Sequence, residues 1–302
     1  MWPSSSRSFD EILAVTRHCE VQGWYGVYLA DHFMPDDPSG EPRSGPYLEC
    51  LAVMAALASA TNQIRIGSLV LGNRYRHPAI VANAATTIDA ISGGRVVLGL
   101  GAGWQQNEHR AYGIELGTVR DRLDHFEEAV EVVSSLLRND ATTFDGRFYQ
   151  LENAPCEPKP VGPLPLLIGG RGEKRTMRIA ARLADEWNAW CTPDLLVSKS
   201  AVLRAHCEEI GRDPSTIRRS TQAMLVAGDD PSRMAEQAAR FSGRPMIVGS
   251  AEAIVDQVGA YASAGADELI IPDWNLGPVD ATLDMLDQFF DVVTASGVVE
   301  PS

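Results

Sequence analysis

The sequence predicts an eight-stranded β/α barrel of the TIM type. Short runs rich in β-branched residues alternate with longer segments of 3.6-residue periodicity, which is the pattern of a parallel sheet with crossover helices. The length of 302 residues is near the roughly 250 that such barrels need, and a hydrophobic fraction of 45% supplies a large core. No internal repeat or linker divides the chain. We therefore expect one domain over residues 1–302.

Seven strands stand out as β-branched or apolar runs, at Trp24–Ala30, Ile64–Leu71, Arg95–Gly101, Leu164–Ile168, Glu186–Trp190, Ile217–Ala227 and Glu268–Ile271. Helical periodicity marks the segments Phe9–Gln22, Tyr47–Ser59, Pro78–Ile91, Asp121–Leu137, Lys174–Leu183, Pro193–Ile210, Pro231–Phe241, Ala251–Ala264 and Val279–Ala295. Proline in the first turn of a helix costs no hydrogen bond, which explains Pro78. Between the two halves lies an irregular insertion, 139–163, with a hairpin at Thr142–Leu151 that turns through Asp145 and Gly146.

A closed barrel needs an eighth strand, and the deficit falls at the front of the chain. Phe9–Gln22 reads as a first helix with almost nothing before it. Either Met1–Pro3 is the stub of the first strand, or the natural start lies upstream of Met1. Unpaired strand edges invite aggregation. We therefore expect Met1 and Trp2 to lie beside an edge of the neighbouring strands, with the N-terminus at the bottom of the barrel.

Composition argues against several classes of partner. The formal charge of −14 provides no positive field for nucleic acid or an anionic membrane. No apolar run reaches the roughly 18 residues of a membrane span, and the N-terminus lacks a signal peptide. The five cysteines form no C-x-x-C pair, and no two histidines have metal-ligand spacing on a helix. We expect free thiols in a cytoplasmic protein and no metal site.

Candidate site residues follow the strands, because active sites of β/α barrels lie at the C-terminal ends of the strands. His32 follows the first visible strand beside Asp31, where it can hold or move a proton near neutral pH. The alternative is a histidine that only caps a loop. His77 precedes Pro78 and is expected to shape its loop. The histidines within helical segments are expected at the surface; they are His18, His109, His125 and His206.

A glycine-rich turn at Gly169–Gly172 is the candidate anion site. It lies between a strand and a helix, so its backbone N–H groups and the helix dipole can hold a phosphate. The densest basic cluster follows, with Arg171, Lys174, Arg175 and Arg178. The alternative is a tight turn followed by a solvated helix face.

A second glycine run, Gly99–Gly103, ends the third strand. It is not a dinucleotide fingerprint, because Trp104 stands where the third glycine belongs and no acidic ribose partner follows. The tryptophans Trp104, Trp187, Trp190 and Trp274 all fall at strand ends. Each is either core or part of an aromatic wall for a planar heterocycle.

These segments together resemble the bacterial-luciferase-like flavin and deazaflavin oxidoreductases over nearly the whole chain. The resemblance rests on an ordered series of motifs: Gly23–His32, Gly67–Pro78, Asp89–Trp104, Glu108, Pro165–Gly170 and Ala184–Asn188. Each motif alone is weak, and the series is specific.

The resemblance implies a barrel, a bound coenzyme F420 or FMN, and usually a homodimer packed through the early helices. It implies a non-prolyl cis peptide, placed here at Leu69–Val70, behind the cofactor ring. It also implies that His32 contacts the reacting ring or carries a proton. The expected cofactor-binding residues are Asp31, Leu69, Val70, Gly101, Ala102, Gly103, Trp104, Gly169, Gly170, Arg171 and Gly172.

Three functions stay open at this point. The leading hypothesis is a coenzyme F420-dependent oxidoreductase that moves hydride between the deazaflavin and a small organic substrate. The second is an FMN-dependent monooxygenase that uses reduced flavin and oxygen. The third is a non-catalytic flavin-binding relative. Some deazaflavin sugar-phosphate dehydrogenases carry a glutamate where Trp104 stands, so the resemblance does not extend to that substrate.

Overall fold

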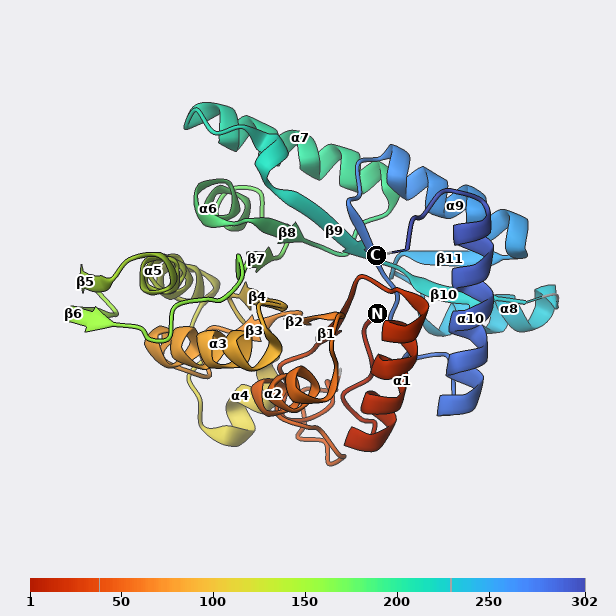
Figure 1. Ribbon diagram of the computed structural model, residues 1–302, viewed down its shortest axis with the longest axis horizontal. Coiled ribbons are helices and arrows are strands. Elements are labelled where there is room, and N and C mark those ends of the chain that lie inside the picture. Colours follow the sequence, from red (N-terminus) through yellow and green to blue (C-terminus); the bar gives the residue numbers. More distant parts are fainter. Residues whose placement is uncertain (38, 229, 302) are drawn as a thin grey trace.

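The computed structural model describes residues 1–37, 39–228 and 230–301, and its centre is a parallel sheet curled into a barrel (Figure 1). The strands of the sheet, in spatial order, are β1 (Gly26–Leu29), β2 (Arg65–Ser68), β4 (Val96–Gly101), β7 (Leu166–Gly169), β8 (Glu186–Asn188), β9 (Arg218–Gln222) and β12 (Glu268–Ile270). All neighbouring pairs are parallel. The predicted barrel class is confirmed.

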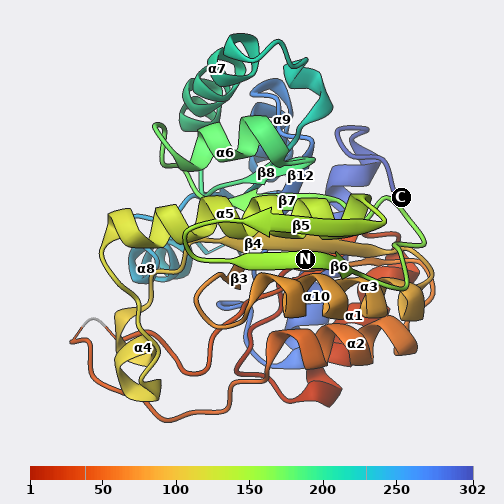
Figure 2. The same ribbon diagram turned by 90° about the vertical axis from the view of Figure 1, so that its left-hand side faces the viewer.

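Helices surround the sheet, as crossover connections require. They are α1 (Phe9–Gln22), α2 (Cys50–Ala60), α3 (Pro78–Ser92), α4 (Gln106–Tyr112), α5 (Val119–Arg138), α6 (Thr176–Leu183), α7 (Pro193–Glu209), α8 (Pro231–Arg240), α9 (Ala251–Ser263) and α10 (Val279–Ala295). The predicted hairpin forms from β5 (Ala141–Asp145) and β6 (Gln150–Pro155), which pair antiparallel. It projects beside α5, on the left in Figure 1 and across the front in Figure 2.

Met1 and Trp2 close the barrel between β1 and β12. Tyr28 donates its backbone N–H to the Met1 carbonyl at 2.9 Å, and Trp2 donates to the Ile271 carbonyl at 2.9 Å. The Asp273 N–H returns to the Trp2 carbonyl at 3.1 Å. Met1 and Trp2 therefore bond to the chain on both sides of the gap, at β1 and just after β12, whereas the sequence analysis expected them beside one edge only.

The predicted strand Ile217–Ala227 is wrong in one respect, because it breaks at Ala223. β9 stays in the barrel, whereas β10 (Met224–Ala227) leaves it and pairs in parallel with β11 (Met246–Gly249), which the sequence did not predict. With α8 between them these strands form a βαβ unit attached to the barrel, on the right in Figure 1. The composition changes at Ala223, from the polar residues of β9 to the apolar residues of β10, but both stretches are compatible with a strand and the sequence analysis took them as one.

The predicted strand Ile64–Leu71 is also interrupted. After β2 the chain makes a cis peptide at Leu69–Val70, as the resemblance implied, and continues as β3 (Leu71–Gly72), which pairs with β4.

The hydrophobic core consists of two clusters, one on each side of the barrel wall. The larger cluster combines strand residues with the buried faces of the helices. The smaller lies inside the barrel and includes Tyr28, Val97, Leu167 and Ile270, which alternate with outward-facing neighbours. Below it, the bottom of the barrel is polar. Its side-chain bonds are Tyr28 Oη to Glu268 Oε2 at 2.9 Å and Arg65 Nη2 to Glu186 Oε1 at 2.9 Å.

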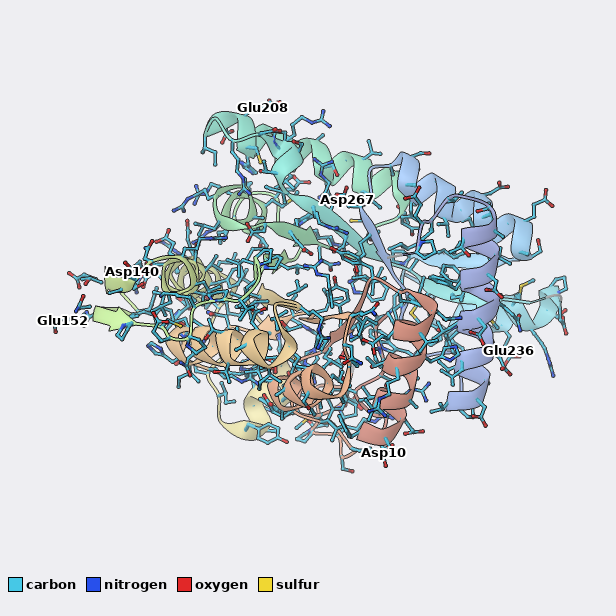
Figure 3. All side chains as sticks on the ribbon, in the orientation of Figure 1. Asp10, Asp140, Glu152, Glu208, Glu236 and Asp267 are labelled. Atoms are coloured by element: carbon cyan, nitrogen blue, oxygen red, sulfur yellow. The ribbon has the colours of Figure 1, made fainter. Side chains whose placement is uncertain are left out.

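The negative charge is spread over the exterior. Figure 3 labels six exposed acidic side chains that come from six different parts of the chain: Asp10, Asp140, Glu152, Glu208, Glu236 and Asp267. All five cysteines are buried and unpaired. Among the described residues, none of the helices has the length and apolar character that a membrane crossing requires.

Candidate active site

A cavity of about 670 Å³ opens at the C-terminal ends of the barrel strands. It is lined by every sequence-predicted site residue except Gly172: Asp31, His32, Leu69, Val70, Gly101, Ala102, Gly103, Trp104, Gly169, Gly170 and Arg171. These residues come from the ends of β1, β2, β4 and β7. Parallel strands bring their carboxyl ends to one rim, which is why residues far apart in the sequence converge here.

The floor of the cavity is built around Val70. A Cβ added at Gly101 would lie 2.6 Å from Val70 Cγ2, and one at Gly169 would lie 2.9 Å from Val70 Cγ1. Any larger residue at these two positions would therefore collide with Val70. The two glycines admit the bulge at Leu69–Val70 into the barrel, and the bulge with its glycines forms a flat apolar surface.

Asp31 is buried beneath this floor and holds the wall together. Its carboxylate accepts two bonds from Arg76, each 2.8 Å, and one from the Gly72 N–H at 2.8 Å. Bidentate arginine–carboxylate pairs fix orientation as well as charge. Protein donors thus use both carboxylate oxygens of Asp31.

Fewer residues are available to an anion at the predicted end of the cavity than the sequence suggested. The Gly170 N–H donates to the Asn188 carbonyl at 2.8 Å, so this amide belongs to the barrel. Gly172 does not line the cavity, but Thr176, in the first turn of α6, does. Arg171 remains as a cation at this end.

The expected basic cluster does not converge on the cavity. Arg175 pairs with Asp124 and with Glu127, the latter at 2.8 Å, and Arg178 lies 3.7 Å from Glu127. These arginines tie α6 to the acidic face of α5 instead. For Arg175 and Arg178 the alternative interpretation, a helix face outside the site, was therefore correct. Their carboxylate partners on α5 lie some 50 residues away in the sequence.

His32 is fixed by a buried glutamate. Its Nδ1 lies 2.7 Å from Glu108 Oε1, and the backbone N–H of Phe33 donates to Glu108 Oε2 at 2.9 Å. The hydroxyl of Tyr75 also bonds to Glu108 Oε1. The Glu108 side chain has no exposure, whereas that of His32 is 19% exposed toward the cavity.

Three donors decide the charge of Glu108. Burial raises the pKa of its carboxyl, but hydrogen bonds from His32, Phe33 and Tyr75 outweigh that effect and bring the pKa below its ordinary value. Burial and the bond to Glu108 raise the pKa of Tyr75, so its hydroxyl stays a donor. Because the carboxylate only accepts, neutral His32 must carry its proton on Nδ1. Its Nε2 is then the nitrogen with a free lone pair.

Sequence reasoning missed Glu108 as a partner of His32 because it missed α4. This helix has seven residues, too few for an apolar period to be visible. The resemblance motif contained Glu108, and that was the available signal. The expectation for His109 is wrong, since it is buried and stacks on Tyr75 with ring centroids 4.8 Å apart. Burial lowers the pKa of His109.

The sequence analysis left open whether each tryptophan belongs to the core or to an aromatic wall of the site, and both cases occur. Trp104, Trp190 and Trp274 line the cavity, and Trp104 meets His32 edge-on with ring centroids 5.5 Å apart. Trp187 is core: it is fully buried, and its Nε1–H donates to the Gly170 carbonyl at 2.8 Å. Trp187 therefore supports the glycine turn from below. Trp2, which closes the barrel, adds a further aromatic wall.

No group of three or more histidine, cysteine, aspartate or glutamate side chains could hold a metal ion within the part of the chain that the structure describes. The cavity combines a histidine that bonds to Glu108 through Nδ1, an apolar floor and an end with an arginine.

Comparison with known proteins identifies the family. The profile of the luciferase-like monooxygenase family matches residues 1–246. The chain belongs to this family.

Relatives within the family include deazaflavin enzymes. An F420-dependent hydroxymycolic acid dehydrogenase of Mycobacterium tuberculosis is 28% identical over 91% of this chain and 76% of its own length. An F420-dependent glucose-6-phosphate dehydrogenase of Kineococcus radiotolerans is 29% identical over 72% of this chain, which spans 64% of that protein. The structure of an F420-dependent secondary alcohol dehydrogenase has a TM-score of 0.85 at 22% identity and covers 97% of both chains. That likeness concerns the fold.

Proposed function

We propose that this protein is a coenzyme F420-dependent oxidoreductase that moves hydride between the deazaflavin and the alcohol or carbonyl carbon of a small-molecule substrate. The observation that carries the proposal is His32, held by Glu108 with one ring nitrogen free at the wall of a glycine-floored cavity. The F420-dependent dehydrogenases among its relatives support the choice of cofactor.

The residues of the cavity fit such a group. A deazaflavin offers a planar apolar ring and a phosphate, and the cavity offers the surface of Leu69 and Val70 with Arg171 and Thr176 at one end. A cavity of about 670 Å³ lies within the range of about 300–1,000 Å³ that cofactor and ligand sites occupy. Bound F420 would supply the ring carbon that accepts or releases hydride.

His32 would handle the proton of the reaction. In the direction of alcohol oxidation, Nε2 takes the hydroxyl proton as the substrate carbon loses its hydride, and in reduction the imidazolium returns it. Glu108 keeps the ring in one tautomer and stabilises the imidazolium that forms. Trp104 and Tyr47 flank the imidazole edge-on and limit its rotation.

The decisive experiment is a titration of the purified protein with F420 and, separately, with FMN, monitored by quenching of tryptophan fluorescence. The proposal predicts tighter binding of F420. Tighter binding of FMN would favour the monooxygenase, for which the same cavity is suitable, and binding of neither would leave a non-catalytic relative.

The anion end has its own test in the substitution Gly170→Asp. It places a carboxylate beside Arg171, so affinity for F420 should fall below detection in the same titration. Because Gly170 has a φ of +125°, the side chain also strains the turn. Gly211→Asp, at φ +71° with open space around its Cβ, controls for backbone strain. Unchanged affinity in Gly170→Asp would remove the turn from the site.

The exposed faces of α2 and α3 support a homodimer. α2 contains no charged residue, and the single charge of α3, Asp89, is buried. Ile80 and Ile91 are 62% and 47% exposed there. Uncharged faces of this kind mark association surfaces. Light scattering should give a dimer mass that Ile80→Arg reduces to the monomer.

We assign the protein to the cytoplasm, in keeping with five unpaired cysteines.

A further inference from the structure

The cavity has a second end that the proposed cofactor site does not use. Three tryptophans meet there: the ring of Trp2 lies 5.9 Å from Trp190 and 4.8 Å from Trp274, and Trp190 lies 5.9 Å from Trp274, between centroids. They come from the N-terminus and from the segments after β8 and β12. All three line the cavity. We call them the tryptophan cluster.

Arg244 lies over this cluster. Its guanidinium carbon is 4.9 Å from the ring centroid of Trp190 and 5.0 Å from that of Trp274. The residue belongs to the loop between α8 and β11, which the attached βαβ unit brings to the rim of the barrel. Stacking on two indoles fixes the plane of the guanidinium and leaves its N–H edges for a ligand.

Arg244 has no carboxylate partner among the described residues, although it lines the cavity. Arg171, at the cofactor end, likewise has no ion pair among the described residues, whereas Arg76 pairs with Asp31 and Glu49, and Arg175 pairs with Asp124 and Glu127. Asp36 acts on Arg244 electrostatically but lies beyond ion-pair distance, and it is exposed to solvent. Arg244 therefore presents a positive charge that no ion pair among the described residues neutralises, although Asp36 also lines the cavity.

Two buried polar atoms at this end also lack partners within the described chain. They are the indole Nε1 of Trp2, in a residue 7% exposed, and Oε1 of Gln222, in a residue 3% exposed. Both residues line the cavity. Buried polar groups in proteins are nearly always satisfied, so unsatisfied ones in a cavity wall indicate a polar ligand.

We propose that the tryptophan cluster and Arg244 form the substrate subsite, and that the substrate is a monocarboxylate with a planar or apolar body. The proposal rests on the oxidoreductase function above and names its substrate class. The carboxylate pairs with Arg244, the body packs on the indoles, and the reacting alcohol or carbonyl reaches His32. A hydroxy acid would lose hydride from its carbon to oxidised F420 and its hydroxyl proton to His32, giving the keto acid and reduced F420.

A phosphorylated substrate fits this end poorly. Among the described residues lining the cavity, Arg171 and Arg244 alone carry permanent positive charge, and Arg171 lies at the cofactor end. One stacked guanidinium matches one carboxylate, whereas a phosphate dianion calls for several donors.

The test uses 3-phenylpropanoate and its uncharged analogue 3-phenylpropanamide as probes, with binding measured by calorimetry to the protein alone and to the protein loaded with F420. The carboxylate should bind about tenfold or more tightly than the amide, because it forms a charge-assisted hydrogen bond. Arg244→Gln should bring the two affinities within about threefold. The matched control is Arg240→Gln, an exposed arginine of α8 paired with Glu236, which should keep the wild-type ratio.

Several results would overturn the subsite. Equal binding of the two probes to the wild-type protein, or failure of both to bind, removes the carboxylate preference. Loss of F420 affinity in Arg244→Gln would assign the guanidinium to the cofactor's acidic tail instead. The proposed function fails separately: if the protein binds no F420 but still prefers the carboxylate probe, the subsite stands and the cofactor assignment falls.

Discussion

The two ends of the barrel each contain a buried glutamate, and the two glutamates differ in the number of hydrogen bonds that they receive. Glu108 at the mouth accepts bonds from His32, Phe33 and Tyr75. Glu268 at the bottom accepts one, from Tyr28, and lies 3.8 Å from Arg218.

The pKa values move in opposite directions as a result. For Glu268, burial raises the pKa, the neighbouring Glu186 adds to the rise, and the bond from Tyr28 does not compensate. For Glu108, burial acts in the same sense, but the donors reverse it. Burial alone therefore does not determine the charge of a buried carboxyl; the count of donors does. The mouth holds a carboxyl with a lowered pKa beside a histidine, and the bottom holds a carboxyl whose pKa is raised.

The largest effect is expected for His32→Ala. Removing the group proposed to carry the proton should lower turnover about 10²–10⁴-fold while the fold remains intact. Steady-state kinetics and circular dichroism check both parts. His18→Ala provides the control, because His18 bonds to Asp287 at 2.7 Å on the helical exterior. A loss below tenfold would give His32 a structural role only.

The same substitution at both ends sharpens the comparison. Glu108→Gln should lower turnover about 10–100-fold, because the amide no longer fixes the tautomer of His32 or stabilises its imidazolium. Glu268→Gln should leave turnover within about twofold, since its side chain faces the opposite end of the barrel. ¹⁵N NMR of the histidine ring gives a direct readout, with the proton on Nδ1 in the wild type and a mixture of tautomers in Glu108→Gln. Equal losses in the two variants would contradict a positioning role for Glu108.

The tyrosines give a smaller contrast. Tyr75→Phe removes one of the three donors to Glu108 and should lower turnover about tenfold or less, because the bonds from His32 and Phe33 remain. Tyr28→Phe should leave kinetics unchanged and reduce the free energy of unfolding by about 1 kcal/mol. Chemical denaturation of both variants measures the second quantity. A kinetic effect of Tyr28→Phe as large as that of Tyr75→Phe would show that the two ends are coupled.

The pH dependence of stability should have opposite signs at the two ends. Because its folded pKa is below the ordinary value of 4.5, Glu108 contributes stability above that pH and loses it as the pH falls through the folded pKa. Glu268, with a raised folded pKa, contributes stability below pH 4.5 and loses it as the pH rises. Relative to each Gln variant, the wild type should lose stability as the pH falls below 4.5 for Glu108 and as the pH rises above 4.5 for Glu268. Denaturation on both sides of this pH tests the sign, and parallel curves would refute it.

The sequence was informative where a residue's role depends on its place along a strand. His32, Leu69, Val70 and Gly169 reach the cavity because strand ends in a parallel barrel share one rim. It was uninformative where the role depends on a partner far along the chain. Glu108 lies in a helix too short to show a period, and the acidic partners of Arg175 come from α5.

The break at Ala223 escaped prediction for a related reason. β9 is polar and β10 is apolar, but each is compatible with a strand, and the change of pairing partner from β12 to β11 is set by tertiary contacts. Arg244, which the sequence analysis did not select, reaches the cavity only through that change.

The attachment of the β10–α8–β11 unit has a consequence for how enzymes of this shape can diversify. The residues proposed to hold the cofactor directly follow the barrel strands β2 and β7 or begin α6, so a change there acts on the barrel itself. Arg244 lies in a connection outside the barrel sheet, where insertions and replacements leave the barrel register untouched. Selection can therefore exchange the acid-recognising end of the pocket as a module while the redox end is inherited unaltered.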